Sequence, residues 1–202
     1  MHSIVIDVES NGLFGGLIAV GAVIVTEEGK RIGQFGGYVR SWPDYEEVIT
    51  PWVDENVMRH CRKQSEECPP WLRMDPYDTT RTLRNTFVEW LRQHMRGAAL
   101  WVDCGFPVET TFLGKIRQAL TNEGEDFVIV HEAATLLLCV SEHQTPRHVF
   151  SRVEEDLQRT YQHNPIWDAW VSWLCIQRAA GMINGHMDRM AEMVDPVGRA
   201  EP

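Results

Sequence analysis

The beginning of the chain has the apolar pattern of buried β-strands. Residues 4–8 are apolar except for Asp7, and residues 17–25 are apolar apart from one glycine. Short apolar runs bounded by turn residues favour strands over helices. The turn at residues 27–29 separates the second run from residues 31–39, as expected for a hairpin. The pattern therefore predicts three antiparallel strands at the start of the chain.

Later segments have apolar residues at helical spacing. Apolar residues recur every four positions from Leu83 to Met95, which predicts a helix over residues 79–95. The same spacing from Val108 to Leu120 predicts a helix over residues 107–121. Two apolar runs predict further strands at 98–103 and 127–130, and additional helices are expected near 54–63, 132–140, 151–160 and 165–180.

The elements follow the order βββ, α, β, α, β, α along the chain. This order predicts an α/β fold in which a mixed five-stranded sheet is flanked by helices. The chain has 202 residues, enough to bury one full core, so we expect a single domain over residues 1–182. Residues 183–202 are polar and contain two prolines, which predicts a C-terminal tail that packs little.

Two carboxylates occupy the first predicted strand. Side chains alternate between the faces of a strand, so Asp7 and Glu9 point the same way. Two buried carboxylates on one face are costly unless a cation neutralises them. Oxygen ligands of this kind suit Mg²⁺ or Mn²⁺. The alternative is an edge strand whose acids face solvent, and for an isolated pair that alternative is at least as common.

A second group of polar residues precedes the last predicted helix. Asn164 is a favourable N-cap and Pro165 suits the first helical position. His163 therefore lies just before the helix and Asp168 in its opening turns, so both side chains can project toward one point. Alone this pair is a weak signal, because a single histidine is more often structural or solvated.

A third acidic segment lies between these two. The apolar run that begins at residue 98 ends at Asp103, just before a predicted helix. Open α/β sheets bind ligands at the carboxyl ends of their strands, so an aspartate at this position is a candidate ligand. The alternative is a loop acid or a helix N-cap.

These three segments, in this order, resemble the motifs of the DEDDh 3′–5′ exonucleases. This DnaQ-like branch of the ribonuclease H-like superfamily includes proofreading subunits and ribonuclease T. The resemblance covers about residues 2–180 and implies a ribonuclease H-like sheet. Residues 51–57 and 103–109 also resemble a bacterial subgroup of these proteins with poorly defined roles.

The second motif departs from the family pattern. Counting back from Phe112-Leu113 places the family's aspartate at Glu109, whereas the strand end places the acid at Asp103. We favour Asp103, because a strand-end aspartate is the arrangement of the wider superfamily. Glu109 remains the alternative.

The resemblance implies a metal-dependent 3′–5′ exonuclease that releases nucleoside 5′-monophosphates from single-stranded DNA or RNA. Two Mg²⁺ or Mn²⁺ ions would activate water and clamp the scissile phosphate. Their ligands would be Asp7, Glu9, Asp168 and Asp103, with Glu109 as the alternative to Asp103. His163 would act as the general base. The loop after the first strand would contact the terminal nucleotide through Ser10, Asn11, Gly12, Leu13 and Phe14.

The charge of the chain restricts the substrate. The formal net charge is −10, whereas affinity for nucleic acid usually comes from Lys and Arg that neutralise phosphates. We therefore expect a short single-stranded 3′ end as the partner rather than a long duplex. Hydrolysis of short oligonucleotides or small nucleotides is one alternative, and a catalytically silent nucleic-acid-binding module is another.

The remaining composition indicates a cytoplasmic protein. No apolar run is long enough to span a membrane, and no signal peptide precedes the first strand, so we expect no membrane partner. The five cysteines are scattered and form no zinc or disulfide pattern, as is common in a reducing compartment. The sequence leaves open whether two copies form a homodimer.

Overall fold

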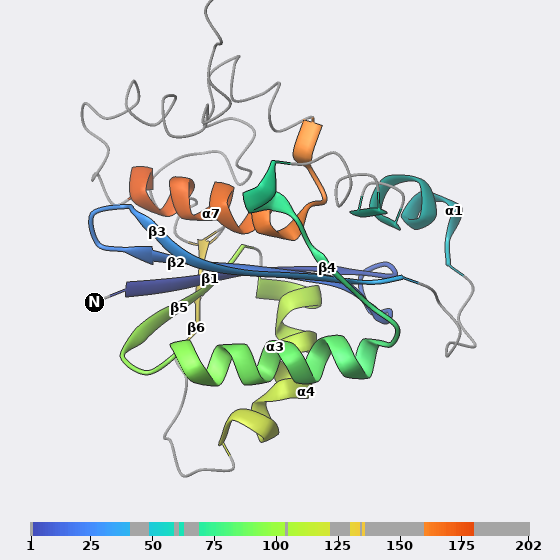
Figure 1. The fold of residues 1–202 in the computed structure, drawn as a ribbon, viewed down its shortest axis with the longest axis horizontal. Coiled ribbons are helices and arrows are strands. Elements are labelled where there is room, and N and C mark those ends of the chain that lie inside the picture. Colours follow the sequence, from blue (N-terminus) through green and yellow to red (C-terminus); the bar gives the residue numbers. More distant parts are fainter. Residues whose placement is uncertain are drawn as a thin grey trace, which may run out of the picture.

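A computed structural model of the chain describes residues 2–40, 49–58, 61–62, 69–103, 105–121, 130–133, 135 and 160–179. These residues form a six-stranded mixed β-sheet with helices on both faces, which confirms the expected α/β class (Figure 1). Most of the helices predicted at 132–140 and 151–160, and all of the predicted tail at 183–202, lie outside the described residues.

Three long antiparallel strands form the centre of the sheet. They are β1 (His2–Ser10), β2 (Leu17–Thr26) and β3 (Arg31–Val39). β2 pairs with β1 on one side and with β3 on the other. Gly29, in the turn between β2 and β3, has a φ of 82°, a conformation that glycine adopts without steric cost. The predicted hairpin is confirmed.

Three shorter strands pair in parallel at the two sides of this centre. β5 (Ala98–Val102) pairs with β1, and β6 (Val130–Glu132) pairs with β5. At the opposite edge β4 (Asp75–Tyr77) pairs with β3, which gives the order β4-β3-β2-β1-β5-β6.

The prediction of five strands was therefore wrong by one. β4 has only three residues, one of which is Pro76, so its sequence has no strand pattern. Proline is tolerated there because β4 lies at the edge of the sheet. The last strand begins at Val130, which is where the predicted run of residues 127–130 ends.

Two long helices cover one face of the sheet, as Figure 1 shows. They are α3 (Thr80–His94), whose buried residues include Leu83, Phe87 and Leu91, and α4 (Thr110–Thr121). A π-helical segment, η3 (Gly105–Glu109), leads into α4. The helices predicted at 79–95 and 107–121 are thus confirmed, except that the second begins with this π-helical turn.

The other face is covered by α7 (Pro165–Ala179), together with short segments that pack in the same core. These segments are α1 (Pro51–Val53), η1 (Asp54–Met58) and η2 (Pro70–Leu72). The helix expected near 54–63 begins earlier, at residue 51, because Thr50 caps it: its Oγ1 accepts a hydrogen bond of 3.3 Å from the Val53 amide. No helix in the described part of the chain has the length and hydropathy that crossing a bilayer requires.

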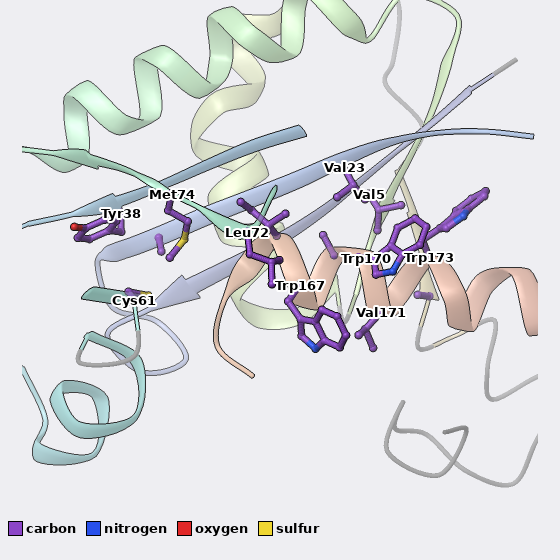
Figure 2. Packing of buried hydrophobic residues seen from close by; sticks show 14 of the residues in the cluster. Val5, Val23, Tyr38, Cys61, Leu72, Met74, Trp167, Trp170, Val171 and Trp173 are labelled. Atoms are coloured by element: carbon purple, nitrogen blue, oxygen red, sulfur yellow. The ribbon is translucent and has the colours of Figure 1, made fainter. Parts of the chain in front are cut away.

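Tryptophans of α7 fill the core between this helix and the sheet. Figure 2 shows Trp167, Trp170 and Trp173 along α7, with Val5 and Val23 contributed by the strands. All three tryptophan side chains are buried. Burial of side chains this large holds α7 against the sheet.

The start of α7 lies directly on glycines of the central strands. A Cβ at Gly21 of β2 would overlap with the backbone of Pro165 and Ile166, and a Cβ at Gly36 of β3 would overlap with the Ile166 side chain. Gly21 is also the cross-strand partner of Asp7. The absence of a side chain at Gly21 therefore lets the first turn of α7 approach the strand that carries Asp7.

We predict that Gly21→Ala destabilises the fold, whereas Gly114→Ala in α4 does not. The Cβ at position 21 meets backbone, so overpacking should cost at least about 1–3 kcal/mol. Gly114 is exposed with open space around it, and Ala there should add roughly 0.5–1 kcal/mol through helix propensity. Urea unfolding of both variants measures the difference. Equal stability of the two would contradict the packing role of Gly21.

Candidate functional site

Asp7 and Glu9 both face α7. The even-numbered residues Ile4, Ile6 and Val8 belong to the core under α3 and α4, so the alternate positions of β1 point to the opposite side. Asp7 is only 7% exposed. The predicted pair of carboxylates on one face is therefore present, and it lies within the fold rather than on a solvated edge.

Asn164 sets where α7 begins. Its Oδ1 accepts hydrogen bonds from the amides of Ile166 (3.0 Å) and Trp167 (3.3 Å), which is the N-cap geometry expected from the sequence. Its Nδ2 donates to the carbonyl of Leu72 at 2.9 Å. Asn164 is fully buried, so these bonds both start the helix and fix it against η2.

His163 connects the start of α7 to β1. Its φ of 65° is in the left-handed region, which turns the chain sharply before the helix. The His163 amide donates to Asp168 Oδ2 at 2.8 Å, and the imidazole Nδ1 lies 3.0 Å from Glu9 Oε1. The carbonyl of His163 accepts a bond of 3.6 Å from the Cys61 thiol. The histidine and the aspartate of the third motif thus converge on the acids of the first.

Three of the predicted acids form one cluster. Carboxylate oxygens of Asp7, Glu9 and Asp168 all lie within 4.8 Å of one another. Among the described residues, no hydrogen-bond donor reaches Asp7 Oδ2, although this atom is buried. A buried carboxylate oxygen without a donor, beside two further carboxylates, is a suitable ligand for a hard divalent cation. These residues therefore fit the metal site expected from the sequence.

The cluster also has the electrostatics of a metal site. Burial raises the pKa of Asp7 well above its usual value, and the charges of Asp168 and Glu9 raise it further. The pKa of Asp168 is raised to about 8, first by burial and then by the charge of Glu9. These carboxyl groups resist ionisation because their negative charges are close together and shielded from water. A bound cation would reverse that effect.

Asp103 follows β5 and contacts α7. Its Oδ1 accepts a hydrogen bond of 2.7 Å from Ser172 Oγ, which also lies 3.0 Å from the carbonyl oxygen of Asp168. Burial is the main cause of its raised pKa, and the bond from Ser172 acts in the opposite direction. Asp103 therefore joins the end of β5 to α7 through Ser172, which lies one helical turn after Asp168.

Glu109 ends η3 and lies close to β1. Its side chain is buried, and burial raises its pKa to about 8, while a hydrogen bond with the Val8 backbone acts in the opposite direction. The charges of Glu109 and Asp103 both raise the pKa of Asp7, and the charge of Asp103 also raises the pKa of Asp168. Both candidates for the second motif thus lie within electrostatic reach of the acid cluster.

The predicted substrate loop lies beside this cluster. Ser10 Oγ donates to the Gly12 carbonyl at 2.5 Å, and Gly12 has a φ of 76°. Leu13 and Phe14 are 63% and 71% exposed, which is unusual for large apolar side chains. Asn11 Oδ1 accepts a bond of 3.4 Å from the Thr50 amide, so the loop is joined to the start of α1.

Three residues near the cluster were not predicted from the sequence. Trp52 is 59% exposed, and its ring meets the His163 imidazole edge-on at 5.8 Å. Ser172 and Cys61 bind Asp103 and the His163 carbonyl, respectively. Ser172 had a signal that could have been used, since it is a polar residue in an otherwise apolar stretch of α7. Nothing in the sequence around Cys61 indicates its contact.

Comparison with solved structures supports the fold. The chain is similar to E. coli exonuclease I, whose crystal structure contains a dT13 oligonucleotide, with a TM-score of 0.54 and 9% sequence identity. The match covers 95% of this chain but only 43% of the exonuclease chain. No protein-family profile and no curated protein matches the sequence. At this identity the likeness shows the fold alone, which is the ribonuclease H-like arrangement expected from the sequence.

We predict that the metal-free protein loses stability as pH rises. The pKa of Asp168 goes from 3.8 to about 8 on folding, so between these values the folded chain holds a proton that the unfolded chain has released. The free energy of unfolding should then fall by up to about 1.4 kcal/mol per pH unit for this proton. Chemical unfolding in EDTA from about pH 5 to pH 8 measures the slope, which Asp168→Asn should reduce.

The effect of divalent cations on stability is the second measurement of the same ionisation. Mg²⁺ or Mn²⁺ should stabilise the wild-type protein more at the upper end of this pH range, since binding displaces the protons. An identical pH slope in the wild type and in Asp168→Asn would show that Asp168 ionises normally in the folded chain.

Proposed function

We propose that this chain is a metal-dependent 3′–5′ exonuclease of single-stranded nucleic acid. The observation that carries the proposal is the cluster of the buried Asp7 with the half-buried Glu9 and Asp168, in which the His163 imidazole is hydrogen-bonded to Glu9. The reaction would be hydrolysis of the terminal phosphodiester, with release of nucleoside 5′-monophosphates. The ribonuclease H-like fold, shared with an exonuclease, is consistent with this chemistry.

Asp7, Glu9 and Asp168 would hold two Mg²⁺ or Mn²⁺ ions, and the cluster supports this assignment. Bound divalent cations supply a Lewis acid for the phosphate and lower the pKa of a bound water. The amide of His163 donates to Asp168 Oδ2 and so holds this carboxylate toward the strand.

Glu109 is our choice for the fourth acid. It lies at the position that the family motif predicts, and its buried carboxyl group raises the pKa of Asp7. Asp103, which we favoured from the sequence, accepts a hydrogen bond from Ser172 and would instead position α7.

His163 would act as the general base. Its bond to Glu9 and its left-handed backbone hold the imidazole at the edge of the acid cluster, where an attacking water would approach. A neutral histidine can accept the proton of that water at physiological pH. The Trp52 ring meets the imidazole edge-on on one side.

The loop of residues 10–14 would receive the terminal nucleotide. Its two exposed apolar side chains, Leu13 and Phe14, could contact the base, because bases stack on aromatic side chains in single-strand sites. Trp52 offers a second exposed aromatic ring near His163. The net charge of −10 favours short oligonucleotides or small nucleotides as a second candidate class of substrate.

We predict that a divalent metal is required for hydrolysis. EDTA should abolish release of 5′-monophosphates from a labelled single-stranded oligonucleotide, and added Mg²⁺ or Mn²⁺ should restore it. Asp7→Asn should keep the fold but lose most of the activity, since it removes a ligand's charge with little change in volume. Circular dichroism provides the folding control. Persistent turnover after exhaustive chelation would refute the metal mechanism.

We also predict that Glu109→Gln and Asp103→Asn differ. The former should lose activity by at least the roughly 10²-fold typical of a missing catalytic group, whereas the latter should retain most of its activity but have lower stability, because it perturbs the acceptor for Ser172. Parallel assays of turnover and thermal unfolding separate the two effects. The reverse result, with Asp103→Asn inactive and Glu109→Gln active, would restore the strand-end assignment.

A further inference from the structure

A pocket of about 70 Å³ lies behind β1, on the side of α3 and α4. Val8 and Ser10 contribute to it from the strand, and these two residues flank Glu9 in the sequence. Leu13 and Gly15 contribute from the loop that we assign to the terminal nucleotide. The pocket is thus a neighbour of the acid cluster, although it opens from the opposite face of the sheet.

Two cations line this pocket. Arg84 comes from α3 and Lys115 from α4, together with the hydroxyl residues Thr80 and Thr111. Within the described residues, neither Arg84 nor Lys115 has a carboxylate partner. This is unexpected in a chain with a net charge of −10, where acidic groups outnumber basic ones. The pocket is therefore an electropositive surface next to a cluster of acids.

The remaining walls favour an occupant with both a charged and an apolar part. Leu13, Leu17 and Phe112 provide apolar surface, whereas the cations and hydroxyls can donate to an anion. Thr80 is the first residue of α3, so the positive end of that helix dipole also lies at the pocket. A nucleotide unit of a strand has this combination, since its phosphate is charged and the carbon atoms of its sugar and base are apolar.

We infer that Arg84 and Lys115 bind a backbone phosphate of the substrate strand upstream of its 3′ end. This inference rests on the proposed exonuclease function. The strand would pass from the acid cluster over the loop of residues 10–15, which contributes to both sites, and place a phosphate between the two cations. Phosphate contacts fix the position of a strand without reading its bases. The pocket thereby supplies the positive charge that the chain as a whole lacks.

The inference is tested with the Arg84→Gln/Lys115→Gln variant of the full chain. Its matched control is Arg81→Gln/Arg92→Gln. The control also removes two positive charges, but from positions of α3 that do not line the pocket. Fluorescence anisotropy measures binding of a labelled oligothymidylate of about ten nucleotides, with Asp7→Asn in all proteins to suppress cleavage. Binding by the pocket variant should weaken on the order of tenfold. The control should bind within about twofold of the reference protein, because exposed charges contribute little.

The salt dependence of oligonucleotide binding shows whether Arg84 and Lys115 neutralise a phosphate. The slope of log affinity against log salt should fall by about 1.4 in the pocket variant, at roughly 0.7 for each cation that no longer neutralises a phosphate. Equal slopes for the pocket variant and the control would overturn the inference. Displacement of the oligonucleotide by inorganic phosphate or thymidine monophosphate at equal concentration would also overturn it, since the pocket would then take free phosphate rather than a strand.

A small substrate separates this inference from the proposed function. Hydrolysis of the p-nitrophenyl ester of thymidine 5′-monophosphate with Mn²⁺ reports the acid cluster, because this ester has no upstream phosphate. The pocket substitutions should lower oligonucleotide turnover about tenfold more than turnover of the ester.

If the wild type hydrolyses neither substrate but its oligonucleotide binding depends on Arg84 and Lys115, the exonuclease proposal fails and the phosphate site stands. If the ester is hydrolysed and both variants bind the strand equally, the phosphate site fails alone.

Discussion

The contact between the first turn of α7 and the centre of the sheet is the constraint on which the site depends. Gly21 lies opposite Asp7 in the strand register and directly under the backbone of Pro165 and Ile166. A side chain at this position would hold the helix away from β2. Because the glycine lets the helix approach, Asp168 reaches the carboxylates of β1. The chemistry of the cluster is thus a consequence of backbone packing at one residue.

This packing concentrates negative charge where water is excluded. Asp7, Asp168 and Glu109 all have raised pKa values, with burial as the first cause in each. Such a cluster opposes folding when its acids ionise, so the rest of the structure must offset the cost. The tryptophans of α7 and the apolar strands provide large buried surfaces on the same side of the sheet. A divalent cation would relieve the repulsion directly, which couples stability to metal binding.

Local sequence patterns predicted the parts of the site that depend on one element. Strand alternation places Asp7 and Glu9 on one face, and the capping chemistry of Asn164 fixes the start of α7; both are found. The strand count failed because β4 forms only through pairing with β3, and its three residues have no pattern of their own. The burial of Glu109 depends on the π-helical turn before α4, which apolar spacing does not reveal.

An acidic chain that performs the proposed function must separate its charges in space. In this chain the sheet provides that separation, because β1 directs Glu9 toward α7 and the neighbouring Val8 toward α3 and α4. Acids that suit a cation therefore lie on one face, and the cations of the pocket, Arg84 and Lys115, lie on the other. The alternation of a single strand would in this way support both the proposed metal site and the proposed phosphate site within a few residues.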